Sequence, residues 1–247
     1  MMAGNKLGQT PPHSACSRGH VNEVDYLLRS SLDSDRLGDG IDVDINLRAA
    51  DDTTTLHIAC EEGHADVVQD LLQAHHIDVN AQATFLGSTP LHVAAKKGHV
   101  RVVWALLQFE HTNAISPGAV GTTPFHSACY KGRRSVVECF LRHMDDKGID
   151  MNVENAFGQP GFHIACSMNH IEVVESMLEF LHGDSSKNVT FDPNLQDMHG
   201  STSLHMLCEK GATEMIQHLL RSQHTRAVIN LNTRNEDAQT PLRSSDT

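Results

Sequence analysis

The sequence predicts an all-α repeat solenoid, a stack of short helix–turn–helix units that each carry a protruding turn. A tetrapeptide similar to Thr-Pro-Leu-His recurs along the chain of 247 residues. A small-residue pair, a Gly-His-like dipeptide and a Leu-Leu-like pair follow the copies in the same order. Self-similarity at a period of a few tens of residues is the signature of stacked repeats. The copies begin at Thr10, Thr54, Thr89, Thr123, Pro160 and Thr202.

The third repeat shows how one unit is built. Thr89 stands where a helix N-cap belongs, and Pro90 suits the first helical position because it has no N–H to leave unpaired. Gly98 is expected to end this first helix, and His99 to open a second one. The apolar residues of the second helix follow the 3.6-residue period: Val102, Val103, Leu106 and Leu107. Helices this short are marginal alone, so neighbouring repeats must cover their apolar faces.

The composition argues against several classes of protein. A net charge of −12 does not suit a general nucleic-acid binder or a protein of anionic membrane surfaces. No apolar run is long enough to span a bilayer, and the first residues lack the apolar core of a secretory signal. We therefore expect an intracellular, cytoplasmic protein, with the nucleus left open.

Five of the six cysteines occupy one equivalent slot, three residues after the tetrapeptide histidine. Equivalent positions in stacked repeats should lie about 10 Å apart, one helix-packing distance. A disulfide needs Cα atoms less than about 7 Å apart. We therefore expect reduced core thiols at Cys16, Cys60, Cys129, Cys166 and Cys208.

These motifs closely resemble the ankyrin repeat, and the resemblance covers nearly the whole chain. The family period is about 33 residues; here His92 and His126 are 34 residues apart, and His13 and His57 are 44 apart. The resemblance implies an ankyrin-repeat stack of helix–turn–helix units with β-hairpin fingers, in one domain over 1–247. The expected repeats cover approximately 9–46, 50–80, 84–116, 118–152, 155–194 and 197–232, with a partial seventh at 235–247.

Some copies depart from the pattern. Pro160-Gly161 replaces Thr-Pro in the fifth copy and removes the capping hydroxyl. Arg133 and Ala212 stand where other repeats have histidine after glycine, and Arg243 replaces the tetrapeptide histidine of the seventh copy. Two interpretations of the C-terminal end stay open: the tail folds back as a partial cap, or the chain is a fragment of a longer protein.

The pairing of His and Cys three residues apart in five repeats could suggest zinc ligands or a thiol–imidazole nucleophile. Zinc needs four convergent ligands, whereas these pairs are spread one to a repeat. We therefore expect no metal, no cofactor and no catalytic residue. The resemblance implies instead that each motif histidine hydrogen-bonds within its own turn and to the backbone of a neighbouring repeat.

Asparagines recur just before the fingers, at Asn46, Asn80, Asn152, Asn194 and Asn232. We interpret them as turn residues, because Asn tolerates the left-handed region and hydrogen-bonds locally. In the ankyrin family an intracellular hydroxylase can modify asparagine at this place. The sequence leaves open whether Asn80, Asn152 or Asn194 is modified.

In the ankyrin family the concave surface, made of finger tips and first-helix ends, does most of the binding, so the resemblance implies candidate residues by position. The middle tips are apolar and the neighbouring helix ends are basic. Exposed apolar side chains indicate an interface, and positive charge favours an acidic partner. Alternatively, the tips pack on one another and the lysines are solvated surface. The candidates are Phe85, Leu86, Lys96, Lys97, Val120, Tyr130, Lys131, Arg133, Arg134, Phe157 and Met168.

The sequence thus predicts a non-catalytic scaffold or adaptor that binds a partner protein or peptide. We expect the partner to be acidic with apolar anchors, and the chain to be a monomer that binds neither nucleic acid nor membrane. Two other functions stay open. The chain could be the targeting or regulatory arm of a larger enzyme or effector whose catalytic domain lies elsewhere, or a self-contained hydrolase that uses a His–Cys pair.

Overall fold

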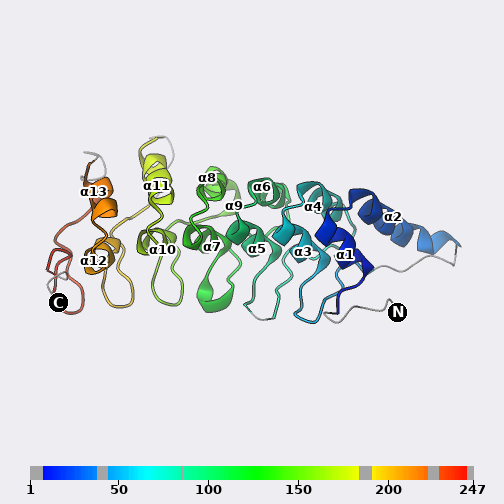
Figure 1. Cartoon of the computed structure of the whole chain (residues 1–247), viewed down its shortest axis with the longest axis horizontal. Coiled ribbons are helices and arrows are strands. Elements are labelled where there is room, and N and C mark those ends of the chain that lie inside the picture. The colour runs from blue at the N-terminus through cyan, green and yellow to red at the C-terminus, as the bar shows by residue number, and fades with distance from the viewer. Residues whose placement is uncertain (1–7, 38–43, 85, 184–190, 222–227, 244–247) are drawn as a thin grey trace. The chain divides into compact units, whose positions relative to one another are not determined.

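The computed structural model describes residues 8–37, 44–84, 86–183, 191–221 and 228–243. The chain divides into two compact units, Met1–Ala119 (unit 1) and Val120–Thr247 (unit 2). Within each unit the first helices of the repeats form one row, the second helices form another, and the loops project from the row of first helices (Figure 1). The predicted helical repeat fold is confirmed.

In unit 1 the first helices are α1 (Pro11–Arg18), α3 (Thr55–Glu62) and α5 (Pro90–Lys97), and the second helices are α2 (Val21–Leu37), α4 (Ala65–Leu72) and α6 (Val100–Gln108). In unit 2 the first helices are α7 (Pro124–Tyr130), α10 (Gly161–Ser167) and α12 (Ser203–Glu209). Its second helices are α8 (Arg134–Arg142), α11 (Ile171–Gly183) and α13 (Thr213–Arg221); a single turn, α9 (Met144–Lys147), follows α8. A short 3-10 turn, η1, covers Ala119–Gly121.

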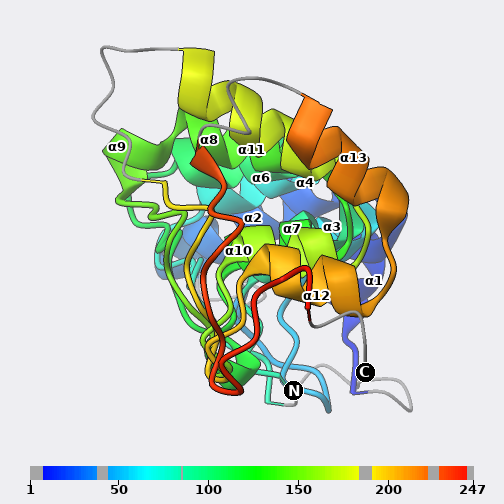
Figure 2. The same ribbon diagram turned by 90° about the vertical axis from the view of Figure 1, so that its left-hand side faces the viewer.

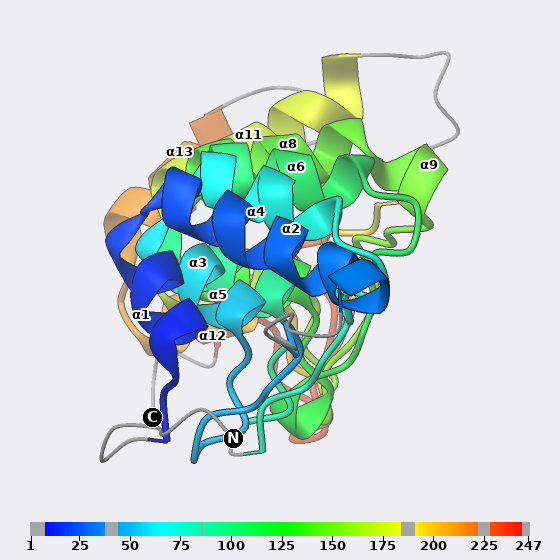
Figure 3. The same cartoon turned by 90° about the vertical axis from the view of Figure 1, so that its right-hand side faces the viewer.

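The loops between repeats form the fingers. Figure 3 shows those of unit 1 leaving from the side of α1 and α3, and Figure 2 shows those of unit 2 on the side of α10 and α12. Several fingers close a turn through their backbone: the Ala83 N–H donates to the Ser88 carbonyl at 3.1 Å, and the Asn155 N–H to the Gln159 carbonyl at 3.1 Å. Among the described residues strand pairing amounts to one isolated antiparallel bridge, between Glu154 and Pro160. The expected β-hairpins are therefore hairpin-shaped loops.

The helices that the structure describes include none with the length and apolar character that crossing a bilayer requires.

The predicted caps of the third repeat are confirmed. The Thr89 hydroxyl accepts a hydrogen bond from the His92 N–H at 3.4 Å, while the Thr89 N–H donates to His92 Nδ1 at 3.2 Å. The pair therefore satisfies two backbone donors reciprocally, as a capping box does, with histidine in the place of Glu or Gln. Gly98 ends α5 with φ of 92°, a conformation that glycine adopts without strain.

The motif histidines also join neighbouring repeats. His57 Nε2 donates to the Ser88 carbonyl at 2.9 Å, and His126 Nε2 donates to the Gln159 carbonyl at 3.2 Å. A carbonyl can only accept, so Nε2 carries the proton and Nδ1 is left to accept from its own capping threonine. The role that the family resemblance implied is thus confirmed for His57, His126 and His205, which make both bonds. The buried imidazoles of His57 and His126 are held in their neutral form.

The asparagines before the fingers bridge repeats as well. Asn46 Nδ2 donates to the His76 carbonyl at 2.7 Å, and Asn46 Oδ1 accepts from the Asp78 N–H at 2.8 Å. Asn80 and Asn194 make the same pair of bonds to the loops that follow them. The non-glycine residues in the left-handed region are others, namely Asp52, His76, Val120, Asn169 and Ala238. The asparagines are turn residues as predicted, but they do not adopt the left-handed conformation. Their side-chain amides instead bond to a neighbouring loop.

The fifth repeat lacks its capping threonine, and the sixth repeat compensates. Pro160 has no hydroxyl, yet His163 Nδ1 lies 3.0 Å from the Ser203 hydroxyl of the next repeat. Packing against the fourth repeat also requires glycine at position 161. A Cβ there would lie 2.7 Å from Cε1 of Phe125, so the missing side chain makes room for the aromatic ring of the fourth repeat.

A similar match joins the ends of the first helices. A Cβ on Gly132 would lie 2.5 Å from Nδ1 of His170, whose Nε2 donates to the Tyr130 carbonyl at 3.0 Å. Gly19 with His64 and Gly63 with His99 repeat this arrangement in unit 1. At the next junction both residues change together: Asn169 replaces the glycine and Ala212 replaces the histidine. There the Ser167 carbonyl accepts instead from Lys210 Nζ, at 2.8 Å.

We expect this last exchange to be coupled. Ala212→His alone should destabilise the protein, because the imidazole would meet the side chain of Asn169. The double variant with Asn169→Gly should recover the loss, with a coupling free energy of about 1 kcal/mol or more in a double-mutant cycle. Urea unfolding of the four proteins measures it, and strictly additive effects would contradict the proposed contact.

Stability should also fall as the pH is lowered. Burial lowers the pKa of His13, His57, His126 and His163 from the ordinary 6.5. Below about pH 6.5 these histidines therefore take up protons in the unfolded chain while they stay neutral in the folded chain. The free energy of unfolding is highest above that pH and decreases as the pH falls. Each histidine contributes at most about 1.4 kcal/mol per pH unit.

Urea midpoints between pH 7.5 and 5.5 check this expectation. His126→Asn should flatten the dependence, whereas the same change at the exposed His75 should leave it unaltered. A midpoint that stays constant or rises on acidification would show that these histidines are not held neutral.

Candidate partner-binding surface

The finger tips of unit 2 carry a row of exposed apolar side chains. Val120, Phe157 and Met198 expose 51%, 47% and 56% of their surface. Backbone bonds join these tips in sequence: the Ala156 N–H donates to the Val120 carbonyl at 2.8 Å, and the Met198 N–H donates to the Phe157 carbonyl at 3.1 Å. The three side chains are thus carried on adjacent fingers that are held in register by their backbones.

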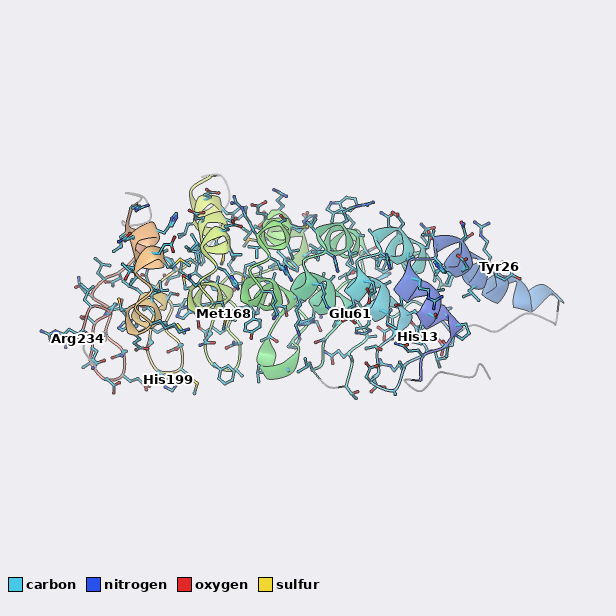
Figure 4. The ribbon with its side chains drawn as sticks, in the orientation of Figure 1. His13, Tyr26, Glu61, Met168, His199 and Arg234 are labelled. Carbon is cyan, nitrogen blue, oxygen red and sulfur yellow. The ribbon has the colours of Figure 1, made fainter. Side chains whose placement is uncertain are left out.

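The ends of the first helices add a second row. Tyr130 is the last residue of α7 and Met168 is the C-cap of α10, and they expose 47% and 43% of their surface. Lys131 Nζ lies 5.1 Å from the centroid of the Tyr130 ring, within range of a cation–π contact. Figure 4 shows Met168 at the row of first helices and His199 at the end of a finger.

In unit 1 the candidates are more polar. Leu86 exposes 44% of its surface, and Lys96 and Lys97 are exposed in the last turn of α5. Lys97 Nζ lies 3.0 Å from a carboxylate oxygen of Glu61 in the preceding repeat. An exposed pair of this kind contributes little stability, so the lysine can exchange its carboxylate for another. Phe85 lies outside the described residues.

The two arginine candidates differ in their surroundings. Arg133 is the exposed N-cap of α8. Arg134 belongs to that second helix, where its Nε donates to Glu138 Oε1 at 2.8 Å, and this hydrogen bond lowers the pKa of the Glu138 carboxyl. A second carboxylate, on Glu179 of α11, lies 3.9 Å from the same guanidinium. Arg134 thus faces the row of second helices rather than the finger side.

Sequence reasoning left Met198 out of the candidate set. The spacing from the glycine does not single it out, because the residue equivalent to Val120 and Phe157, one before the left-handed glycine, is His199. Met198 stands one residue earlier. Lys210 is the other omission. Its ammonium is exposed beside α10 and bonds to both the carbonyl and the hydroxyl of Ser167, at 2.8 and 2.7 Å.

The His–Cys pairs have a structural role. All six cysteines are buried free thiols, and burial raises the pKa of Cys16 and of Cys166 to about 12. A nucleophile must be a thiolate that substrate can reach, which these groups are not. In the described part of the chain, no three His, Cys, Asp or Glu side chains gather as a metal site would need.

A family model of three consecutive ankyrin repeats matches residues 2–83, 56–155 and 138–233. The chain therefore belongs to the ankyrin repeat family, whose repeats are protein–protein interaction modules and are generally non-catalytic. No protein among curated sequences matches it.

Two solved structures illustrate the likeness of fold. The ankyrin repeat domain of Bcl-3, described as a unique member of the IkappaB protein family, is 21% identical with a TM-score of 0.77, and the match covers 98% of each chain. The ankyrin repeat domain of human ASB11 is 22% identical with a TM-score of 0.71, over 96% of this chain and 92% of that one. At this identity the likeness concerns the fold alone.

The cysteines provide a direct test of the buried core. Because the thiols are buried, Ellman's reagent should modify them far more slowly in the native protein than in urea. Unfolding should release all six for reaction. A cysteine that reacts as fast in buffer as in denaturant would show that its repeat opens without the rest of the stack.

Proposed function

We propose that this protein is a non-catalytic adaptor whose unit 2 binds a segment of another protein along its finger tips and first-helix ends. The observation that carries the proposal is the double row of exposed apolar side chains in that unit. Val120, Phe157 and Met198 expose about half of their surface on adjacent fingers, and Tyr130 and Met168 do so on the helix ends. Large exposed apolar groups gathered in this way favour an interface, with the aromatic rings as anchors.

The charge beside these rows supports an acidic partner. Lys131, Arg133 and Lys210 are basic in a chain whose net charge is −12. Positive charge next to an apolar interface steers an acidic segment toward it and adds specificity more than affinity. The partner chemistry we propose is therefore an acidic stretch with apolar anchor residues. Leu86, Lys96 and Lys97 of unit 1 are proposed as further contacts of the same kind.

Six buried free thiols favour a compartment that keeps cysteine reduced. We therefore place the adaptor role in the cytoplasm, and expect the chain to act as a monomer.

The anchors can be tested by replacement. The double variant Tyr130→Ala with Phe157→Ala should lose the captured partners in a pull-down from cell extract, quantified by mass spectrometry. Each buried aromatic anchor is worth about 2 kcal/mol, or roughly thirtyfold in affinity. Binding should also weaken between 50 and 300 mM salt, because added salt screens the basic groups.

Tyr26→Ala is the matched control, since Tyr26 is a similarly exposed aromatic residue on α2 of unit 1. The control should retain the partners that the double variant loses. If both variants capture the same proteins as the unaltered chain, while circular dichroism shows intact folding, unit 2 does not bind through these rows.

A further inference from the structure

The most exposed methionines among the described residues both lie on the adaptor surface of unit 2. Met168, labelled in Figure 4, is the C-cap of α10 and exposes 43% of its surface, and Met198 on a finger tip exposes 56%. Met151, Met177 and Met215 are by contrast almost fully buried. In the part of the chain that the structure describes, the thioethers that solvent reaches most freely are therefore two of the apolar groups proposed to hold a partner.

The fold does not require a methionine at either position. The residue five places after the tetrapeptide histidine is Met168 in the fifth repeat and a charged residue in the others. These charged residues are Arg18, Glu62, Lys97, Lys131 and Lys210. The place of Met198 is defined by its backbone N–H, which donates to the preceding finger, and Ala156 and Glu236 hold the same place on the adjacent fingers. Small and charged side chains thus serve the scaffold equally well at these positions.

The cysteines do not compete with these methionines for an oxidant. A thiol is oxidised mainly as a thiolate that the oxidant can reach. All six thiols are buried, and burial raises the pKa of each of them. A thioether has no proton to lose, so its exposure decides how fast it reacts. A mild oxidant should therefore modify the adaptor surface before it modifies the core.

The reaction is a two-electron oxygen transfer. The thioether sulfur attacks one oxygen of a hydroperoxide, so that an S–O bond forms and the O–O bond breaks. The sulfur is oxidised to the sulfoxide, while the other oxygen takes up the proton and leaves as water or an alcohol. A dithiol reductase reverses the change, because its two thiols become a disulfide and the sulfoxide oxygen leaves as water. Oxidation thus turns a flexible apolar side chain into a polar one.

We propose that Met168 and Met198 form a reversible oxidation site, through which a hydroperoxide switches off partner binding by unit 2. The inference rests on the adaptor function proposed above and adds its regulation. A sulfoxide that is covered by the apolar anchors of a partner must give up its hydrogen bonds to water, which is costly. In the free protein the same sulfoxide stays in water, as the charged residues at equivalent positions do. Oxidation should therefore weaken binding and leave the stability of the protein unchanged.

Hydrogen peroxide is the probe for the site itself, and this measurement needs no partner. The full chain is treated in native buffer, and its peptides are mapped by mass spectrometry. Met168 and Met198 should become sulfoxides at least about tenfold faster than Met177 and Met215, and the rates should become similar in urea. Oxidation of the buried methionines or of the cysteines as fast as Met168 and Met198 in the native protein would overturn the proposal.

Binding is measured on the proteins that the unaltered chain captures from cell extract. The chain oxidised at both methionines should capture them at least about fivefold less well, and methionine sulfoxide reductases supplied with a dithiol should restore the capture. Met168→Leu with Met198→Leu keeps apolar side chains of similar volume, so this variant should bind equally before and after peroxide treatment. Met168→Gln with Met198→Gln should weaken the capture without peroxide, with an unchanged urea midpoint.

Full capture by the oxidised chain, or an equal loss of capture by the peroxide-treated leucine variant, would overturn the switch. The double variant Tyr130→Ala with Phe157→Ala separates this result from the adaptor proposal. If that variant captures everything that the unaltered chain does, the adaptor surface itself is wrong. If it loses the partners while oxidation of Met168 and Met198 does not release them, only the switch is wrong.

Discussion

Most repeats bury polar groups that are satisfied by the next repeat along the chain. The tetrapeptide histidines His57, His126 and His205 accept from their own capping threonines and donate to a carbonyl in the following finger, as His57 does with Ser88 at 2.9 Å. A buried imidazole without that partner would lose a hydrogen bond and keep its desolvation cost. Because the bond crosses a repeat boundary, the helix pairs that make it are not complete alone.

This dependence makes each junction specific. In unit 2 Phe125 requires the absence of a side chain at Gly161, and His163 receives its hydroxyl from Ser203 in place of the threonine that its own repeat lacks. Such residues look like random departures from a consensus when a single repeat is considered. Across the junction they are complementary pairs, so the repeats of this unit could not be reordered without loss of packing or hydrogen bonds.

The repeat pattern therefore predicted the scaffold well and its exceptions poorly. Helix positions and caps follow from local chemistry, and Thr89, Pro90 and Gly98 were sufficient to predict the bounds of α5. The bridging role of Asn46 could not be predicted in the same way, because the His76 carbonyl that it reaches is distant in sequence. Arg134 was assigned to the finger side for a different reason. Its partner Glu138 is only four residues away, a spacing that places both side chains on one face of a helix and that the assignment left out of account.

Function is to be sought at the surface residues that the repeat fold does not require. Many of the bonds that join repeats use backbone groups and buried side chains, so the exposed finger-tip side chains can vary without loss of the fold. An exposed Phe157 on such a tip contributes nothing to the shared core, and in water its apolar surface is a cost. Trp104 presents the same problem on the row of second helices of unit 1, where a polar residue such as Gln69 serves the fold equally well. Apolar groups kept at positions that the scaffold leaves free are best explained by partners that cover them.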